Sequence, residues 1–289
     1  MCFPSSAFVS ASAYDFFVRI PFFVGLILVL STCFLHAAFP ADSSGWHLVW
    51  DDEFNGGNGS VPDRTKWIIE TGGSGWGNHE LEYYTNHLQN IQVQDGNLVI
   101  TARHEAYSDN GVLFGYTSAR IKTEHKFEQA YGRFEARIQI PRGQGIWPAF
   151  WLLGDDGGKI DWPACGEIDI LENIGKEPGI VHGTIHGPGY SGGKGIGSPF
   201  SLPNGQAFAD GFHIYAVEWE PNAIRFYVDD NLYATRTPAD LPAGTKWVFD
   251  HPFFIILNVA VGGDWPGNPD YTTKFPQTML VDYVRVYKH

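Results

Sequence analysis

The chain has 289 residues, 44% of them apolar and 18% charged, which is enough apolar material for a buried core and excludes a disordered tail. Its 32 acidic residues outnumber its 19 basic residues, and the resulting net charge of −13 argues against nucleic acid or an anionic membrane surface as a partner. The 34 glycines and 18 prolines favour many turns over long helices.

The first 41 residues differ from the rest and are typical of a secretory signal. Arg19 precedes an apolar run over residues 20–30, and small residues follow that run. The alternative is an N-terminal membrane anchor, which needs a longer uninterrupted apolar run than this one. We therefore expect a secreted protein with no stable membrane association, cleaved after Ala37, Ala38 or Ala41.

Residues 42–289 show no internal repeat and no break in composition, so they predict a single domain, and nothing marks an interface between copies, so we expect a monomer. Cys2 and Cys33 fall in the signal, which leaves only Cys165 and excludes a disulfide within the mature chain. Stability must then come from the core. An N-glycosylation sequon begins at Asn58 and matters only in a eukaryotic secretory route.

Period-two alternation dominates the mature chain and predicts strands with one buried face. In the segment 134–140, for example, Phe134, Ala136 and Ile138 alternate with polar residues. We expect further strands at residues 97–104, 118–127, 213–220, 224–229, 253–261 and 279–288, separated by turn-forming clusters that include 155–158, 188–197 and 262–270. This pattern predicts an all-β fold, a jelly-roll-like sandwich of two antiparallel sheets.

The most informative segment is residues 162–173, which carries three carboxylates among β-forming residues. On a strand, Glu167 and Asp169 project from one face because side chains repeat every two residues. Glu172 lies five residues from Glu167 and would point to the opposite face of a regular strand. One extra residue near 170–171 would return it, so we predict a β-bulge there, with all three acids on one side.

Three such acids meet the requirement of glycoside cleavage, in which one carboxylate attacks the anomeric carbon while a protonated partner donates to the leaving oxygen. Crowding of like charges raises the pKa of at least one acid, which can then hold a proton near the working pH. Aromatic residues close in sequence favour a cleft over the alternative of a solvated acidic strand; they are Trp147, Phe150, Trp151 and Trp162.

A metal site is the competing chemistry, since hard cations also bind clustered carboxylates. The order of the acids does not match the calcium loop of helix–loop–helix proteins. His182 and His186 could share one strand face, but a zinc site needs a third ligand that nothing nearby identifies. The glycine-rich run 187–197 fails as a phosphate loop because Gly195, rather than Ser or Thr, follows Lys194.

The segment 166–173, Gly-Glu-Ile-Asp-Ile-Leu-Glu-Asn, resembles the signature of glycoside hydrolase family 16 in its laminarinase-like branch. The lichenase branch has one residue fewer between the acids. Other segments that look like the family are 50–55, 76–85, 118–121, 147–151, 182–186, 216–219 and 281–287. The resemblance covers most of the mature chain and implies a jelly roll with a long substrate cleft and a retaining double displacement.

By this resemblance, Glu167 is the nucleophile, Glu172 the general acid/base and Asp169 a hydrogen-bonding partner that tunes the nucleophile. No cofactor is required for the chemistry. The resemblance also implies that sugar subsites are lined by Asn78, Arg120, Trp147, Trp151 and His186, and Trp265 is expected to border the cleft. Indole faces stack on sugar rings, whereas amide, guanidinium and imidazole groups supply hydrogen bonds. We expect Trp50 and Trp219 to pack in the core.

Family members often bind one structural calcium on their convex side. Asp282 matches the aspartate of that site, and Glu53 and Gly96 are expected to donate backbone carbonyls. The alternative is that Asp282 pairs with Arg285 or another neighbour.

The resemblance favours an endo-acting hydrolase of β-1,3-glucan that also cuts mixed-linkage β-1,3-1,4-glucan. A non-catalytic β-glucan recognition protein is disfavoured because all three acids are present. A galactan hydrolase shares the bulged signature and is disfavoured by the laminarinase-like segments 76–85 and 182–191. A transglycosylase remains open, because a sugar hydroxyl can replace water in the second step.

Overall fold

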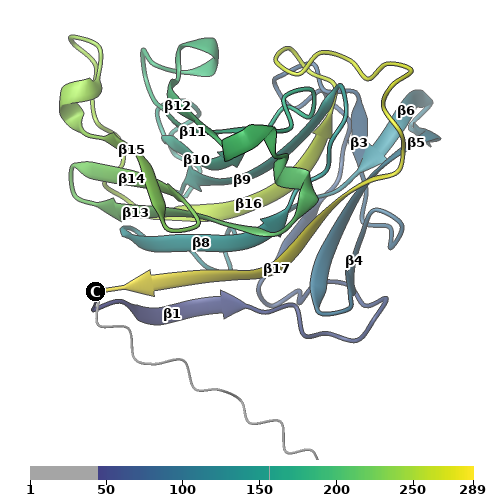
Figure 1. The fold of residues 1–289 in the computed structure, drawn as a ribbon, viewed down its shortest axis with the longest axis horizontal. Helices are drawn as coiled ribbons and strands as arrows, with labels where there is room; N and C mark the ends of the chain where they lie inside the picture. The colour runs from purple at the N-terminus through teal and green to yellow at the C-terminus, as the bar shows by residue number, and fades with distance from the viewer. Residues whose placement is uncertain (1–44, 156) are drawn as a thin grey trace, which may run out of the picture. The chain divides into compact units, whose positions relative to one another are not determined.

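The structure, a computed structural model, describes residues 45–155 and 157–289 (Figure 1). The described residues belong to one compact unit. The predicted signal, with its two cysteines and its three candidate cleavage sites, lies outside the described residues. In the described part of the chain, no helix has the length and apolar character to cross a membrane.

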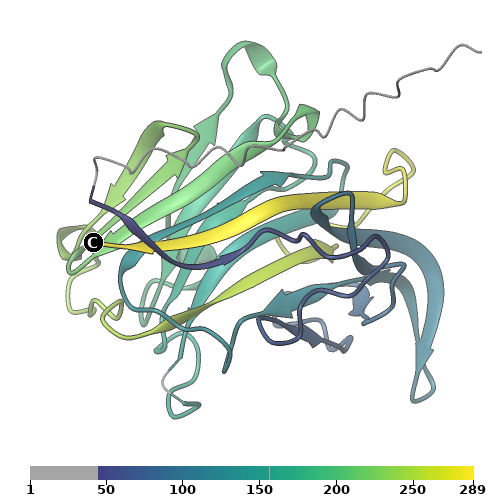
Figure 2. The same cartoon turned by 90° about the horizontal axis from the view of Figure 1, so that it is seen from below.

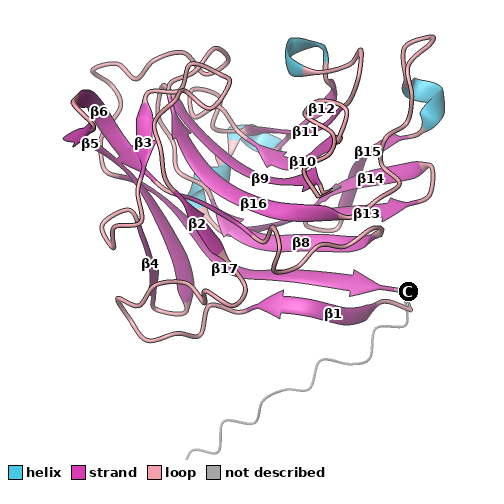
Figure 3. Cartoon of the chain, turned by 180° about the vertical axis from the view of Figure 1, so that it is seen from behind, coloured by secondary structure: helices cyan, strands magenta, loops and turns pink. Residues whose placement is uncertain are grey.

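Strands make up nearly all of the regular structure, and the described helices are single 3₁₀ turns (Figure 3). The larger sheet has the order β15-β14-β13-β8-β17-β5-β6-β3, with β1 added on β17 and β4 added on β5. Its strands are β1 (His47–Asp52), β3 (Glu82–Tyr84), β4 (Ile91–Gln94), β5 (Asn97–Asp109), β6 (Val112–Ser118), β8 (Gly132–Gln139), β13 (His213–Glu220), β14 (Ala223–Val228), β15 (Asn231–Arg236) and β17 (Gln277–Lys288). Viewed from below, β1 lies alongside β17 (Figure 2).

The second sheet has the order β12-β11-β10-β9-β16-β7-β2. Its strands are β2 (Ile68–Glu70), β7 (Arg120–Lys122), β9 (Ile146–Gly154), β10 (Glu167–Glu172), β11 (Ile180–His186), β12 (Ile196–Ser201) and β16 (Phe253–Val261). Every ladder in this sheet is antiparallel. The two sheets face each other, as the predicted sandwich requires (Figure 1).

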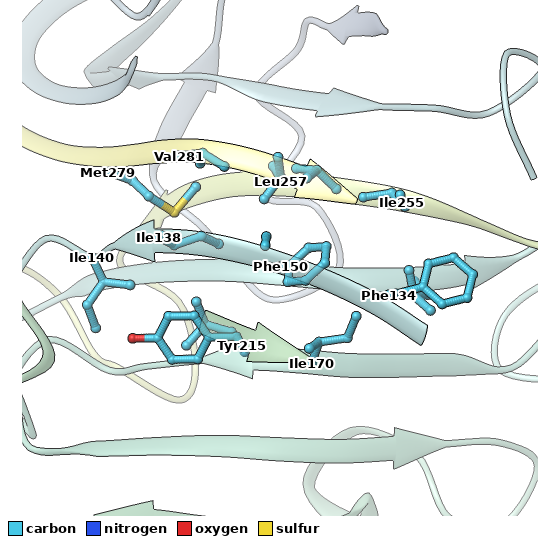
Figure 4. Close-up of a cluster of buried hydrophobic side chains, with 14 of the residues drawn as sticks. Phe134, Ile138, Ile140, Phe150, Ile170, Tyr215, Ile255, Leu257, Met279 and Val281 are labelled. Carbon is cyan, nitrogen blue, oxygen red and sulfur yellow. The ribbon is translucent and has the colours of Figure 1, made fainter. Parts of the chain in front are cut away.

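The core lies between the two sheets (Figure 4). Phe134 and Ile138 of β8 meet Phe150 of β9 and Ile170 of β10, and each is at most 1% exposed. Burial of this many large apolar side chains is the main driving force for folding of the described residues, which contain one cysteine and therefore no disulfide among themselves. The prediction for Trp219 is confirmed, since it is fully buried, and Trp50 packs against the edge of the core.

The predicted strands at 213–220 and 253–261 are confirmed with the same bounds. The predicted strand at 118–127 is wrong beyond Lys122, because the chain turns there and His125 adopts a left-handed φ of 59°. Strand β9 escaped prediction because Pro148 lies inside it, and proline lacks the N–H that a central strand uses.

Candidate active site

Strand β10 lies in the middle of the second sheet, between β9 and β11. Its pairing with β9 shifts by one residue: Asp169 lies opposite Trp151, whereas Leu171 lies opposite Phe150. The pairing with β11 shifts over the same stretch, between Asp169 and Glu172. The predicted bulge is therefore confirmed, and it returns Glu172 to the face that carries the other two acids.

The other side chains of β10 explain why the bulge is stable. Ile168, Ile170 and Leu171 are each at most 1% exposed and belong to the core. Ile170 and Leu171 follow each other and both pack in the core, which the register shift allows because it interrupts the alternation of the strand at this point. Core packing of this strand therefore fixes the orientation of the acids on its other side.

Each catalytic candidate has a defined partner. Trp162 Nε1 donates to Glu167 Oε2 at 2.6 Å, and Trp147 Nε1 donates to Glu172 Oε1 at 3.1 Å. Asp169 is 3% exposed and shares a side-chain hydrogen bond with Glu167. Each of the two glutamates therefore accepts one hydrogen bond from an indole N–H.

His186 of β11 completes the cluster. Its Nε2 lies 3.0 Å from Asp169 Oδ2 and 4.0 Å from Glu167 Oε1. Burial lowers the pKa of His186, and the negative charge of Glu167 acts against that effect. The interaction of His186 with the charge of Glu167 lowers the pKa of that acid and so favours its ionised form.

Burial and mutual repulsion shift the pKa values of all three acids upward. Burial, together with the charge of Asp169, raises the pKa of Glu167 to about 8. Burial, together with the charge of Glu167, raises the pKa of Glu172 to about 8. For Asp169, burial and the charge of Glu172 raise the pKa well above its usual range. The cluster therefore holds protons at neutral pH, which is the condition for general acid catalysis.

Indoles and imidazoles line the side of the site nearest Glu172. The rings of Trp147 and Trp265 meet edge to face with centroids 5.7 Å apart, and Trp265 is 38% exposed. His182, opposite Glu172 on β11, lies 5.0 Å from the Trp265 ring. The predicted cleft residues Trp147 and Trp265 are thus in contact with each other.

A second aromatic group lies around Arg120 of β7. Its guanidinium lies 4.7 Å from the Trp76 ring and 4.9 Å from the Trp151 ring, so it is close to both indoles. Glu70 accepts a hydrogen bond from Arg120 Nε. Trp151 Nε1 donates to Asn258 Oδ1 at 2.8 Å. Arg120 and Trp151, both predicted subsite residues, are therefore held in fixed orientations.

Asn78 lies in the segment before β3, where its Nδ2 donates to Glu80 Oε1 at 3.1 Å. The backbone carbonyl of Asn78 accepts from Asp264 N at 2.9 Å, which ties this segment to the loop that carries Trp265. Gly263, with a φ of 109°, passes so close to Trp147 that a Cβ would lie 3.3 Å from its ring. Asn78 thus belongs to the same wall as Trp147 and Trp265.

Sequence reasoning did not assign roles to Trp162, Glu70, Trp76 or Asn258. Trp76 stood in a family-like segment, which was the available signal. Trp162 lies five residues before Glu167, and only the folded loop between them shows that its indole reaches the carboxylate. Nothing in the sequence pattern marks Glu70 or Asn258, because their partners are distant along the chain.

The residues predicted for calcium lie on the other sheet. Arg137 Nη1 donates to Asp282 Oδ2 at 2.7 Å, and Arg285 binds Glu53 through two hydrogen bonds of 2.7 and 2.9 Å. The expected alternative, a pairing of Asp282 with Arg285 or a neighbour, is realised with Arg137. Gly96 lies in the β4–β5 turn with a φ of 74°.

Asn58, the first residue of the sequon, is bound to the same turn. Its Nδ2 donates to Asp95 Oδ1 at 2.8 Å, and Asp95 N donates to Asn58 Oδ1 at 2.8 Å. A glycan on Asn58 would have to be accommodated beside this pairing.

The protein is an all-β sandwich in which three carboxylates share one face of a bulged strand and several indoles lie beside them. These are the features of a glycoside hydrolase. The comparisons then give the family. The model of glycosyl hydrolases family 16 matches residues 78–285, so the chain belongs to this family, and the resemblance noted in the sequence is confirmed.

The chain is 44% identical over 273 residues to a β-glucanase of Rhodothermus marinus, covering 91% of this chain and 93% of that protein. It is 41% identical to glucan endo-1,3-β-glucosidase A1 of Niallia circulans, where it covers 85% of this chain but only 38% of the longer relative. It is also similar to the crystal structure of the laminarinase catalytic domain of Thermotoga maritima, with a TM-score of 0.80, 52% identity and coverage of 84% and 98%.

Proposed function

We propose that the protein is a secreted, endo-acting hydrolase of β-1,3-glucan that retains the anomeric configuration. The observation that carries the mechanism is the bulge in β10, which puts Glu167, Asp169 and Glu172 on one face beside indole side chains. The choice of glucan is supported by similarity to proteins named β-glucanase and laminarinase.

In the first step, Glu167 attacks the anomeric carbon while Glu172 gives its proton to the glycosidic oxygen, so that the bond to the leaving sugar breaks. The charge on Glu167 is stabilised by the Trp162 indole and by the nearby His186. In the second step, the deprotonated Glu172 takes a proton from water, and that water releases the glycosyl group from Glu167. Asp169 holds Glu167 in orientation throughout.

A digestion panel tests the substrate. The purified protein is incubated with laminarin, lichenan, curdlan and agarose, and the products are sized. We expect short oligosaccharides from laminarin and curdlan and slower release from lichenan. Product from agarose alone would identify a galactan hydrolase, and tight binding to laminarin without turnover would identify a recognition protein. Elongated oligosaccharides would identify a transglycosylase.

The two glutamate roles are tested separately. Glu167→Ser removes the nucleophile, and we expect a loss of at least about 10⁴-fold in kcat. Glu172→Ala removes the acid/base, and added azide should restore turnover of an aryl glucoside by trapping the glycosyl-enzyme. Glu220→Gln on β13 is the matched control and should retain full activity. Activity retained by Glu167→Ser would refute the assignment.

We propose that a structural calcium ion binds at Asp282. The fit rests on three adjoining segments: Asp282 lies at an irregularity in β17, Glu53 follows the strand residue that pairs with Val284, and Gly96 precedes the β5 residues that pair with β17. Because Arg285 occupies the Glu53 carboxylate and Arg137 binds Asp282 Oδ2, calcium would take the backbone carbonyl of Glu53 and Oδ1 of Asp282. Calcium prefers such a set of carboxylate and carbonyl oxygens. Its role would be to join β1, β17 and the β4–β5 turn.

Secretion and a monomeric state complete the proposal. The sequence pattern of residues 1–41 supports export and removal of this segment. N-terminal sequencing of protein recovered from the medium tests the cleavage after Ala37, Ala38 or Ala41. Gel filtration of the mature chain tests the monomer.

A further inference from the structure

The segment that carries Asn78 rests on a buried acid that the proposed mechanism does not use. Glu82, in β3, is 0% exposed. Its Oε2 accepts a hydrogen bond from the backbone N–H of Val261 at 2.6 Å, at the end of β16. Its Oε1 is buried and receives no hydrogen bond. A carboxylate oxygen buried without a donor costs free energy, whereas a neutral acid would place its own proton on that oxygen.

Glu80 is the neighbouring carboxyl group to which a protonated Glu82 could donate a hydrogen bond. It interacts with Glu82 through both charge and a side-chain hydrogen bond. Glu80 Oε1 also accepts from Asn78 Nδ2, and Glu80 Oε2 accepts from the Tyr84 hydroxyl, both at 3.1 Å. Both carboxylate oxygens of Glu80 therefore act as hydrogen-bond acceptors. A protonated Glu82 is the neighbour that can donate a further hydrogen bond to them.

The same chain of hydrogen bonds continues to the floor of the site. Asn258 Nδ2 donates to the Tyr84 hydroxyl at 3.2 Å, and Asn258 Oδ1 accepts from Trp151 Nε1 at 2.8 Å. The series from Glu82 to Trp151 thus joins the segment that bears Asn78 to strands β16 and β9. In a buried network of this kind, loss of one donor affects the members beyond it.

We propose that Glu82 is a positioning residue that acts as a neutral acid, donating to Glu80 and thereby fixing Asn78 and Trp151 for substrate. The inference rests on the proposed function, because Asn78 and Trp151 are assigned there to the sugar subsites. It predicts that ionisation of Glu82 loosens this wall of the site and weakens binding of the glucan.

The groups around Glu82 fit this role. Burial raises the pKa of Glu82 well above its usual range, and the charge of Glu80 raises it further. On the same strand, burial and the charges of Glu80 and Glu82 raise the pKa of the Tyr84 hydroxyl, whereas Arg120 of β7 lowers it. From β16 the facing groups are the Val261 N–H and the Asn258 amide, and on β6 Tyr116 pairs with Glu82. The His79–Asp264 ion pair lies at the exposed rim.

Binding of laminarihexaose is measured by calorimetry from neutral to alkaline pH, with Glu167→Ser as a parent that cannot turn it over. We expect affinity to fall by at least about tenfold at alkaline pH in the parent. Adding Glu82→Gln should leave affinity at neutral pH within about threefold and remove the alkaline loss, because the amide donates to Glu80 at every pH. Adding Glu82→Ala should weaken binding at every pH.

Parallel pH profiles for the parent and its Glu82→Gln derivative would overturn the proposal. A second readout needs no ligand: infrared difference spectra of wild type against Glu82→Gln should contain the carbonyl band of a neutral carboxylic acid. Absence of that band would also overturn the proposal. If the parent fails to bind laminarihexaose at any pH, the glucan assignment fails, and the infrared result still decides the state of Glu82.

Discussion

Glu167 and Glu172 sit in similar environments, each partly buried and each bound by one indole N–H. Because their charges repel, the reactive form is the one in which a single proton remains on Glu172 while Glu167 is ionised. If both glutamates are protonated, nucleophilic attack is blocked. If both are ionised, no acid remains to protonate the leaving group. The two residues therefore act as a pair whose protonation sets the working pH range.

The alkaline limb of the pH profile should report Glu172. Burial and the charge of Glu167 raise its pKa to about 8, so kcat/KM should fall about tenfold per pH unit above that value. Trp147→Phe keeps an aromatic ring but removes the hydrogen bond that now lowers this pKa, so the limb should move to higher pH. Initial rates on laminarin across the alkaline range test both statements, and a limb that moves to lower pH would contradict them.

The acids of the site should also lower the stability of the folded state at alkaline pH. The folded-state pKa of Glu167 is raised above its unfolded value, so the stability it contributes is complete below its ordinary pKa and is lost as pH rises through about 8. Glu167→Gln removes that loss, and its Tm should exceed that of wild type by about 2–6 °C at alkaline pH. The difference should disappear in acid.

The control for this measurement is Glu220→Gln. Glu220 accepts a hydrogen bond from Arg225 Nη1 at 2.6 Å in a partly exposed pair, and such pairs contribute little to stability. Its Tm should follow that of wild type at every pH. A Glu167→Gln variant that is less stable than wild type at alkaline pH would contradict this prediction, because it would show that the ionised Glu167 stabilises the folded state.

At the scale of elements, the bulge in β10 gives a test of register. Deletion of Ile170 leaves Glu167, Asp169 and Glu172 at successive two-residue steps, which a regular strand presents on one face. Insertion of an alanine after Ile170 also puts Glu172 on that face of a regular strand, but six residues from Glu167, which is about 20 Å along the strand and too far for two catalytic carboxylates to act on one bond. We expect the deletion to retain measurable activity and the insertion to lose at least about 10³-fold, as judged by laminarin turnover. Circular dichroism checks that both variants fold, and the reverse order of activity would contradict the register argument.

Elements with regular alternation could be predicted from the sequence, and so could the bulge, because the spacing of three acids allows few ways to share a face. Prediction of strands from alternation failed where tertiary contacts override the local sequence pattern. Strand β9 was missed because Pro148 lies inside it, and the predicted strand at 118–127 was too long because the chain turns after Lys122. The role of Glu82 was also out of reach, since its partner N–H lies 179 residues away along the chain.

For the whole molecule, the calcium proposal predicts a dependence of stability on the ion. A chelator should lower the Tm of wild type by about 5 °C or more, and added calcium should restore it, because a ligand bound only by the folded state stabilises that state. Asp282→Ala should start at the lower Tm and respond to neither addition. Calorimetric scans of both proteins decide the matter, and a wild-type Tm indifferent to the chelator would rule out the site.

Strand β16 is buried at all nine of its positions. One of its faces belongs to the core, while the other supplies Asn258 beneath Trp151, and its last residue anchors Glu82. Because every position of this strand is buried, a random substitution at any of them disturbs packing. Laboratory evolution toward a new polysaccharide should therefore accumulate changes in the rim loops at 76–80 and 262–268 and leave this strand untouched.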